Sequence, residues 1–172
     1  MAFDHKWYKV RRNTVQIAPG KVIDDYFLGV FPNIALIVAI TKNNKIVMVR
    51  QYKAGANSIT LEVPAGYIDG KETPLHAAKR ELLEETGYHA TKWTKLGFFY
   101  GNPTKEQGNG IHIFLATGAQ RVTEQNLDEN ESIAIKVISL KEALNKIATN
   151  EINVAGSAAA ILMASRKLEK PR

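Results

Sequence analysis

The sequence predicts a single α/β domain with a β-hairpin extension at its N-terminus. Three observations lead to this prediction. The chain has 172 residues, of which 45% are hydrophobic and 23% charged, so it is long enough for one domain with a sizeable core and too short for two. Several segments have the composition of strands, and others have the apolar spacing of helices. Both kinds mingle along the chain without repeats or low-complexity segments, as in one mixed domain.

The first third of the chain is typical of two hairpins. Residues 1–30 contain two β-prone segments that are separated by the turn signal Pro19-Gly20. Residues 34–40 and 46–52 flank the polar turn TKNNK and predict a second hairpin. Because residues 34–40 are almost wholly apolar, we expect this strand to be central in a sheet that is covered on both faces. The segment SITLEVPAG then adds a short strand.

A helix follows, with signals at both of its ends. Thr73 is placed to cap the N-terminus, Pro74 suits the first turn, and Gly87 suits the C-terminal cap. Apolar residues recur between these positions at helical spacing, which predicts one buried stripe. The predicted stripe consists of Leu75, Ala78, Leu82 and Leu83.

The second half of the chain predicts strands, two loops and two helices. In chain order it contains the strand WTKLGFFY, the loop GNPTKEQGNG, the strand IHIFLAT, the acidic loop EQNLDENES and the strand IAIKVISL. Two helical segments, over residues 140–149 and roughly 155–168, close the chain.

Composition limits the chemistry and the partners. The absence of cysteine excludes disulfides, thiolate zinc sites and thiol nucleophiles, so any metal must bind oxygen or imidazole ligands. The longest apolar run, residues 34–40, is far shorter than a membrane span, and we expect a soluble, cytoplasmic protein with no membrane partner. The net charge of +6 leaves open nucleic acid, a membrane surface or a phosphorylated small molecule as an anionic partner. Because Lys and Arg are scattered, we interpret most of this charge as solvated faces.

Three carboxylates share one face of the predicted helix. Glu81, Glu84 and Glu85 stand at positions i, i+3 and i+4, where like charges repel by a few tenths of a kcal/mol per pair. Arg80 is the only cation immediately beside them. Hard oxygen ligands at this spacing suit Mg²⁺ or Mn²⁺. The alternative is a solvated acidic face, as on many helices.

The neighbouring residues favour the metal site. From Gly66 the chain reads glycine, five residues, Glu72, seven residues and then RELLEETGY. This resembles the Nudix box, residues 66–88 here, whose pattern ends in Arg-Glu-apolar-any-Glu-Glu-any-Gly-apolar. All the fixed positions are present. Only Tyr88 departs from the pattern, because it stands where an aliphatic residue is usual.

The resemblance implies the Nudix fold, a mixed sheet between helices, as a single domain over residues 1–172. It also implies hydrolysis of a nucleoside diphosphate that is linked to another moiety. The implied roles are metal binding by Glu81, Glu85 and the backbone carbonyl of Ala65, a further ligand or water positioner in Glu84, and an orienting pair in Arg80 and Glu72. Divalent metal suits this reaction because it neutralises the diphosphate and lowers the pKa of a bound water.

Features outside the box resemble the ADP-ribose pyrophosphatase branch. The segment RQYK precedes LEVPAG here, much as RQ-aromatic-R precedes E-x-P-A-G in that branch. Arg50 and Lys53 are therefore candidates for phosphate contacts, although Lys53 lacks the bidentate fork of an arginine. Pro103 matches a loop proline that would frame the distal sugar. The alternatives are ordinary surface charge and an ordinary turn proline.

The same resemblance implies a general base and an aromatic that stacks on the nucleobase. The segment ENESIAIKVISL resembles the loop that supplies the base, with Glu131 the best match and Glu129 next. The segment KWYKVR resembles the N-terminal part of ADP-ribose hydrolases, where an aromatic stacks on the base across a dimer interface. Trp7 is the first candidate, with Tyr26 or Phe27 second. The alternatives are solvated loop acids and aromatics packed within the hairpin.

We therefore expect a Mg²⁺-dependent homodimeric enzyme, with residues 1–30 as its dimerisation and base-binding element. Its expected reaction is hydrolysis of ADP-ribose or a related nucleoside diphosphate sugar to a nucleoside monophosphate and a sugar phosphate. A second reading places the enzyme on dinucleotide polyphosphates, capped RNA or nucleoside triphosphates. A reading of another class is a non-catalytic module that binds ADP-ribose-like ligands, against which the intact glutamates argue. A nucleic-acid binder, the remaining option, would show affinity that falls steeply with salt.

Overall fold

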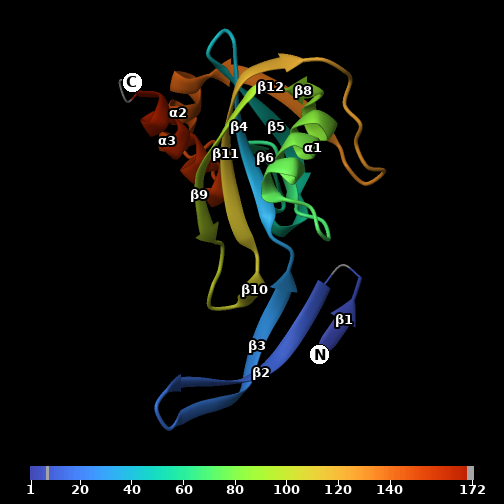
Figure 1. Ribbon diagram of the computed structural model, residues 1–172, viewed down its shortest axis with the longest axis vertical. Coiled ribbons are helices and arrows are strands. Elements are labelled where there is room, and N and C mark those ends of the chain that lie inside the picture. Colours follow the sequence, from blue (N-terminus) through green and yellow to red (C-terminus); the bar gives the residue numbers. More distant parts are fainter. Residues whose placement is uncertain (7, 170–172) are drawn as a thin grey trace.

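The structure is a computed structural model that describes residues 1–6 and 8–169. Figure 1 shows a body of sheet and helices from which a long hairpin extends. The elements in chain order are β1 (Phe3–His5), β2 (Tyr8–Ala18), β3 (Lys21–Phe31), β4 (Ile34–Thr41), β5 (Lys45–Lys53), the short 3₁₀ helix Ala54–Ala56, β6 (Ser58–Glu62), β7 (Ala65–Tyr67), α1 (Pro74–Thr86), β8 (Tyr88–His89), β9 (Lys92–Tyr100), β10 (Glu106–Gly108), β11 (Gly110–Arg121), β12 (Ile133–Ser139), α2 (Leu140–Ala148) and α3 (Ala155–Glu169).

The main sheet is mixed and has β4 near its centre. Its order is β12, β5, β4, β11 and β8, with β6 added on β5, β7 on β4 and β9 on β11. β4 and β11 run parallel, with Ile34 opposite Ile111, whereas the pairs β4 with β5 and β11 with β9 are antiparallel. The predicted α/β fold, a mixed sheet between helices with an N-terminal hairpin extension, is confirmed.

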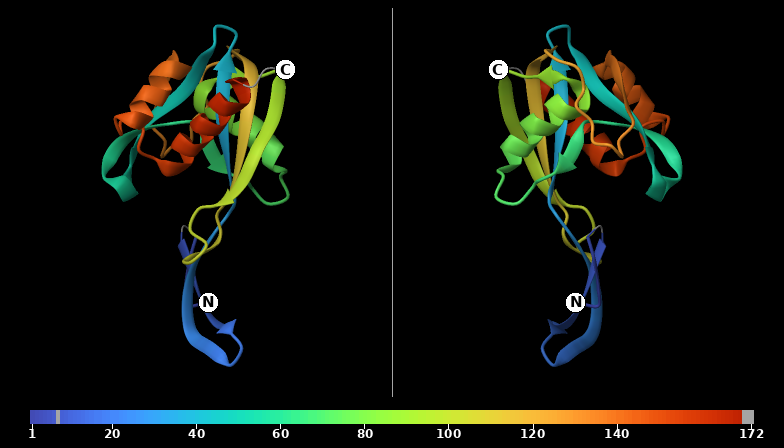
Figure 2. Two further views of the ribbon diagram at one scale, coloured as in Figure 1. Left: turned by 90° about the vertical axis from the view of Figure 1, so that its left-hand side faces the viewer. Right: turned by 90° about the vertical axis from the view of Figure 1, so that its right-hand side faces the viewer.

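Both faces of β4 are buried, as its apolar sequence predicts. Alternate residues of a strand point to opposite faces of the sheet. Ile37 therefore packs in one cluster with Leu82 of α1, and Val38 packs in a second cluster with Ala160 and Ile161 of α3. Figure 2 shows α1 on one side of the sheet and α2 and α3 on the other. This arrangement fixes α1 across the strands that carry the candidate site.

The ends of α1 lie where the sequence predicts them. Oγ1 of Thr73 accepts a hydrogen bond from the backbone N–H of His76 at 3.2 Å, and Pro74 opens the first turn. Gly87 ends the helix in the left-handed region, at φ 69°. A side chain at Gly87 would also collide with the backbone of Thr123, so glycine is required there for two reasons.

The buried stripe of α1 differs from the predicted one. Leu75 and Leu83 are exposed, whereas Ala77, Ala78 and Leu82 are buried against the sheet. The two alanines allow the helix to lie close to the strands, and this turns the next positions of the same face, which are acidic, toward the edge of the sheet. The periodicity was correct, but its phase was wrong by part of a turn.

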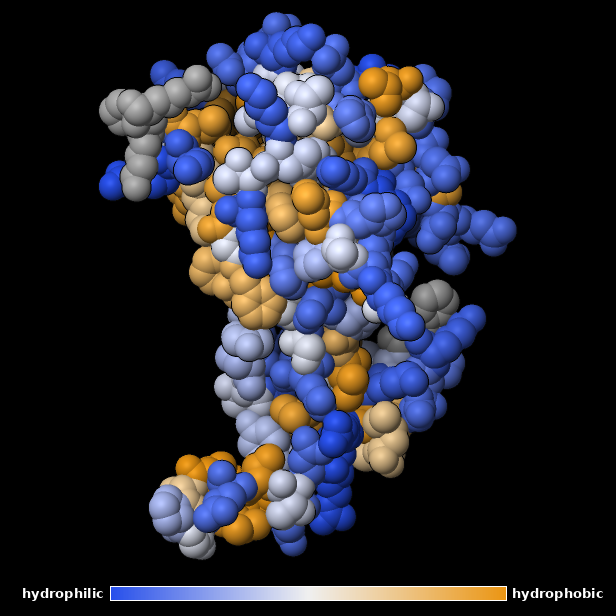
Figure 3. All heavy atoms as spheres, in the orientation of Figure 1, coloured by the Kyte–Doolittle hydropathy of each residue, from blue (hydrophilic) through white to orange (hydrophobic). Residues whose placement is uncertain are grey.

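β2 and β3 form the long arm that extends from the body (Figures 1 and 2). Their turn is the predicted Pro19-Gly20. The outer part of the arm exposes apolar side chains, among them Ile17 and Val22, and Figure 3 shows this apolar surface at the end of the arm. β10 pairs in parallel with β3, although its sequence was expected to be loop. Among the described residues, no helix has the length and apolar content needed to cross a membrane.

Candidate active site

Three glutamates of α1 reach the edge of the main sheet beside β7. Their helical spacing places Glu81, Glu84 and Glu85 on neighbouring positions of one face. Oε2 of Glu85 accepts a hydrogen bond from the backbone N–H of Ala65 at 3.0 Å. A Cβ on Gly66 would collide with the carboxylate of Glu81, so β7 passes the helix here only because this residue is glycine. The sheet backbone and the acidic face of α1 are therefore in direct contact.

Arg80 binds the surrounding carboxylates and a backbone carbonyl. Its Nε and Nη2 donate to the two oxygens of Glu72 at 3.2 and 3.0 Å, in a bidentate pair. Its Nη1 donates to Glu81 at 2.7 Å and to Glu84 at 3.0 Å, and its Nη2 also donates to the carbonyl of Tyr67. This guanidinium lowers the pKa of Glu72 to about 2, and the same contacts raise the pKa of Arg80 above its ordinary value. The predicted pair of Arg80 with Glu72 is thus present.

Glu85 is the most deeply buried of the three glutamates, at 3% exposure. Burial, with smaller contributions from the negative charges of Glu81 and Glu131, raises its pKa to about 8, although the hydrogen bond from Ala65 opposes this shift. Burial also raises the pKa of Glu81, although Arg80 opposes this shift. A nearby cation would stabilise the ionised forms of both carboxylates, because an opposite charge lowers the pKa of a carboxyl group.

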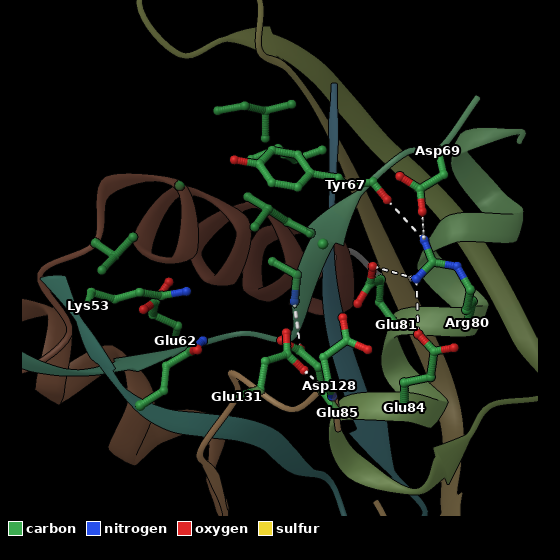
Figure 4. A pocket seen from close by; sticks show the side chains of 18 of the residues that line it. Lys53, Glu62, Tyr67, Asp69, Arg80, Glu81, Glu84, Glu85, Asp128 and Glu131 are labelled. Atoms are coloured by element: carbon green, nitrogen blue, oxygen red, sulfur yellow. Dashed lines mark hydrogen bonds and ion pairs between the residues drawn. The ribbon is translucent and has the colours of Figure 1, made fainter. Parts of the chain in front are cut away.

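The glutamates face a cavity of about 690 Å³ (Figure 4). Figure 4 shows the glutamates of α1 and Arg80 on one side of the cavity and Lys53 of β5 and Glu62 of β6 on the other. The lining includes the polar residues Gln51, Lys53, Glu62, Tyr67, Arg80, Glu81, Glu84, Glu85, Asp128 and Glu131, together with Ala65 and the apolar residues Ile34, Leu36 and Ile111.

Glu131 reaches this cavity from the acidic loop between β11 and β12. Figure 4 shows it beside Glu85 and across from the other carboxylates of α1. Its side chain accepts a hydrogen bond from the backbone N–H of Asp128 at 3.2 Å, and its own N–H donates to the carbonyl of Asp128 at 3.0 Å. The helix α1 and this loop therefore share one site, although the end of α1 at residue 86 and Glu131 are 45 positions apart in the sequence.

The other predicted site residues fall into two groups. Lys53 lines the cavity, whereas Arg50 points to the opposite face of β5 and lines a separate hollow of about 410 Å³. Pro103 and Glu129 are exposed and are not among the residues that line the cavity. Tyr26 contacts the loop before β10, because its hydroxyl donates to the carbonyl of Thr104 at 2.6 Å.

Two of the aromatic candidates of the arm, Tyr26 and Phe27, are not among the residues that line the cavity. Phe27 on β3 is 47% exposed. Trp7 lies outside the described residues. The roles of Trp7, Tyr26 and Phe27 in base stacking stay predictions.

Several residues of the cavity were not predicted from the sequence. Glu62 is only 7% exposed and lies 2.5 Å from the hydroxyl of Thr60, which donates to it. Asp128 and Gln51 also line the cavity. A signal for Glu62 was available, since it is the acidic residue of LEVPAG and a lone carboxylate in an apolar strand needs a polar neighbour. Asp128 had no such signal, because it is one of several acids in a polar loop.

The donor set fits a hard divalent cation. Glu81, Glu84 and Glu85 offer only carboxylate oxygens, which Mg²⁺ and Mn²⁺ prefer over softer ligands. Within residues 1–6 and 8–169, no three acidic or histidine side chains already stand where they could hold one ion together. Glu81 and Glu84 are instead turned to Arg80. A cation would therefore compete with Arg80 for these carboxylates, while Glu85 needs only to lose a proton.

Comparison with known proteins decides the family. The model of the NUDIX domain matches residues 31–156, which is most of the chain. The chain belongs to the NUDIX domain family. The family match, together with a relative that is 35% identical over 85% of the chain, shows that this Nudix protein is a pyrophosphohydrolase.

Two relatives and one solved structure are similar to this Nudix protein over most of its length. It is 35% identical, over 161 residues, to a Bacillus subtilis (strain 168) protein named ADP-ribose pyrophosphatase, covering 85% of this chain and 86% of that protein. It is 36% identical, over 122 residues, to the methanol dehydrogenase activator of Bacillus methanolicus, covering 70% of this chain and 65% of that protein. A crystal structure of an ADP compounds hydrolase matches 97% of this chain and 89% of that one, with a TM-score of 0.84 at 22% identity, which confirms the Nudix fold.

Proposed function

We propose that this Nudix protein hydrolyses the diphosphate linkage of ADP-ribose or of a related nucleoside diphosphate sugar in a Mg²⁺-dependent reaction. The products are a nucleoside monophosphate and a sugar phosphate, which are AMP and ribose 5-phosphate when the substrate is ADP-ribose. The named activity of the Bacillus subtilis relative supports this substrate, because the two chains are similar over most of their lengths.

The observation that carries the proposal is the meeting of Glu131 with the glutamates of α1 at one cavity. Glu131 comes from a loop rather than from the box, and it lies close enough to raise the pKa of both Glu81 and Glu85. A base placed beside metal-binding carboxylates can take the proton of a water that those carboxylates help to position. A module that only binds its ligand has no need of this arrangement.

The reaction assigns a separate task to each group. A water oxygen attacks one phosphorus of the diphosphate, the bond from that phosphorus to the bridging oxygen breaks, and the water proton passes to Glu131. A divalent metal bound by Glu81, Glu84, Glu85 and the carbonyl of Ala65 would supply charge neutralisation and a more acidic water. Arg80 keeps the glutamates oriented through its contacts with three of the acidic side chains around it.

Lys53 and the cavity size support an extended anionic substrate. The cavity of about 690 Å³ lies within the range of roughly 300 to 1,000 Å³ that holds small ligands. Lys53 stands on the side of the cavity away from Arg80, so it is available to a phosphate oxygen or a sugar hydroxyl. Arg50, on the other face of β5, would serve a substrate of this chain only after a rearrangement of that strand.

A second copy of the chain is part of the proposal. The arm of β2 and β3 exposes Ile17, Val22 and Phe27, which a monomer leaves in water. Burying the arm against a partner subunit would cover these side chains and bring its aromatics, including Trp7 and Tyr26, toward a neighbouring cavity. The base would then stack on an aromatic of the partner subunit, and the predicted homodimer would be the active form.

The test is a hydrolysis screen with Mg²⁺ over ADP-ribose, other nucleoside diphosphate sugars, a dinucleotide polyphosphate, capped RNA and nucleoside triphosphates. We expect AMP and ribose 5-phosphate in equal amounts from ADP-ribose, and faster turnover of nucleoside diphosphate sugars than of the other classes. The same reaction in ¹⁸O-labelled water identifies the attacked phosphorus. Full activity in Glu85→Gln, or turnover of nucleoside triphosphates alone, would contradict the proposal.

A further inference from the structure

Gln125 joins the helix of the glutamates to the loop that carries Glu131. Its side-chain nitrogen, Nε2, donates to the backbone carbonyl of Glu85 at 2.7 Å and to that of Ile133 at 3.0 Å. Glu85 lies in the last turn of α1, and Ile133 is the first residue of β12. Both N–H groups of this amide are therefore used, each on a different element.

These two bonds enclose the loop. The segment from residue 126 to residue 132 connects Gln125 to β12, and Glu131 lies near the end of this segment. The N–H of Asn126 adds a bond to the carbonyl of Glu84 at 2.9 Å. The loop thus starts on the last turn of α1, and its far end is tied back to that same turn through Gln125.

A glutamine side chain suits this position, because its amide donates twice and has the length to reach both carbonyls. Glutamate at residue 125 would present oxygens to two carbonyl oxygens, and asparagine is shorter by one methylene, so neither can make both bonds. Methionine has nearly the same length and shape but has no donor. The carbonyl of Glu85 is one of the carbonyls at the helix end that lack an intrahelical partner. The alternative role for Gln125 is therefore a purely structural one, as a cap of the C-terminus of α1.

We propose that Gln125 is a positioning residue, which holds Glu131 at a fixed place beside the glutamates of α1. It touches neither substrate nor metal, and it acts by setting the distance between two segments that meet only at the site. The inference rests on the proposed function, since Glu131 is its general base. A placement error of about 1 Å costs on the order of 10²-fold in rate, which makes such a bond worth keeping in a loop that is otherwise solvated.

The experiment compares Gln125→Met with the wild type, with Glu131→Gln and with the double variant. Gln120→Met is the matched control, because Gln120 is an exposed glutamine near the end of β11. We expect Gln125→Met to lower kcat for ADP-ribose by about 10- to 100-fold, with KM and the Mg²⁺ concentration for half activity changed by less than about threefold. In the Glu131→Gln background the same substitution should lower kcat by less than about twofold, since the group that it positions is already gone.

Hydrogen exchange supplies a readout that does not depend on catalysis. We expect amides of residues 126–132 to exchange faster in Gln125→Met than in the wild type or in Gln120→Met, while amides in the centre of α1 keep their rates. A merely structural cap predicts the reverse, with faster exchange along the last turn of α1 and equal losses of kcat in both backgrounds. Either of those two results would overturn the inference.

The outcomes separate this inference from the proposed function. If the wild type hydrolyses ADP-ribose and Glu131→Gln lowers kcat, but Gln125→Met does not, the function stands and the positioning role fails. If the wild type hydrolyses no nucleoside diphosphate sugar, the proposed function fails, and unchanged exchange in residues 126–132 would then also remove the positioning role. A fall in Mg²⁺ affinity of Gln125→Met without the loop effect would show that Gln125 acts on Glu85 instead, and would overturn the inference as stated.

Discussion

Replacing Glu85 by glutamine, which does not ionise, should stabilise the metal-free protein at neutral pH. The side chain is 3% exposed, and its pKa is raised from an ordinary 4.5 to about 8 because burial disfavours the carboxylate. The folded state therefore holds a proton that the unfolded chain has already released over this pH range. Stability that is fully present below about pH 4.5 is lost as the pH rises toward 8.

The size of the effect follows from the two pKa values. Each pH unit between 4.5 and about 8 costs the folded state about 1.4 kcal/mol. The slope is smaller near each of the two pKa values, where only part of the protein changes protonation, so the free energy of unfolding should fall by roughly 3 kcal/mol between about pH 5 and about pH 8 in metal-free buffer. Glu85→Gln has nearly the same shape, and its amide oxygen can still accept the N–H of Ala65, but it does not titrate. Its unfolding free energy should lack this fall, so at about pH 8 it exceeds the wild type by roughly 3 kcal/mol.

Urea unfolding in the presence of a chelator, at several pH values across this range, measures the difference. Glu142→Gln is the control, because Glu142 is an exposed glutamate in the first turn of α2. Added Mg²⁺ should raise the melting temperature of the wild type more at high pH than at low pH, and that of Glu85→Gln much less. Parallel pH dependence of the wild type and Glu85→Gln would refute the reasoning, since it would mean that Glu85 is ionised in the metal-free fold.

Three further predictions concern Arg80, Gly66 and the arm of β2 and β3. Arg80→Met should lower activity by on the order of 10²-fold. Because Arg80 holds the pKa of Glu72 at about 2, the wild type should lose stability as the pH falls from 4.5 to 2, and acid unfolding of Arg80→Met should lack this fall. Gly66→Ala should leave the circular dichroism spectrum intact but lower Mg²⁺-dependent activity by at least about tenfold, because the new methyl group displaces Glu81. Val22→Asp should convert a dimer to a monomer in light scattering, whereas a monomeric wild type would contradict the proposed dimer.

The sequence predicted α1 almost completely because its signals are local. A cap at Thr73, a proline at Pro74 and a glycine at Gly87 act within one turn of the helix, so they keep their meaning whatever the helix packs against. The face that α1 buries is set by the neighbouring strands instead. The small residues Ala77 and Ala78 pack against the sheet, and no pattern within the helix shows that they, rather than Leu75 and Leu83, are the buried ones.

The alternation of side chains along β5 explains why Arg50 and Lys53 lie on different faces of the sheet. The resemblance placed both residues at a phosphate, but the side chains of a strand alternate, and an odd separation of three positions puts them on opposite faces. Parity alone could have shown that the two cannot serve one pocket of the same chain. The pairing of β10 with β3 was out of reach, because Gln107 and its neighbours gain strand structure only where the arm passes them.

The sequence predicts that the glutamates of α1 repel one another, but it does not predict which of them bears the energetic cost. The repulsion among Glu81, Glu84 and Glu85 follows from their spacing. The fold distributes it unequally: Arg80 forms ion pairs with Glu81 and Glu84, whereas Glu85 is buried and accepts a hydrogen bond from the N–H of Ala65. In the metal-free protein the acidic face of α1 is thus stabilised by the ion pairs of Arg80 and by a proton on Glu85. Binding a divalent cation to Glu85 must displace that proton, which links the protonation of Glu85 to metal affinity and makes metal binding release a proton below about pH 8.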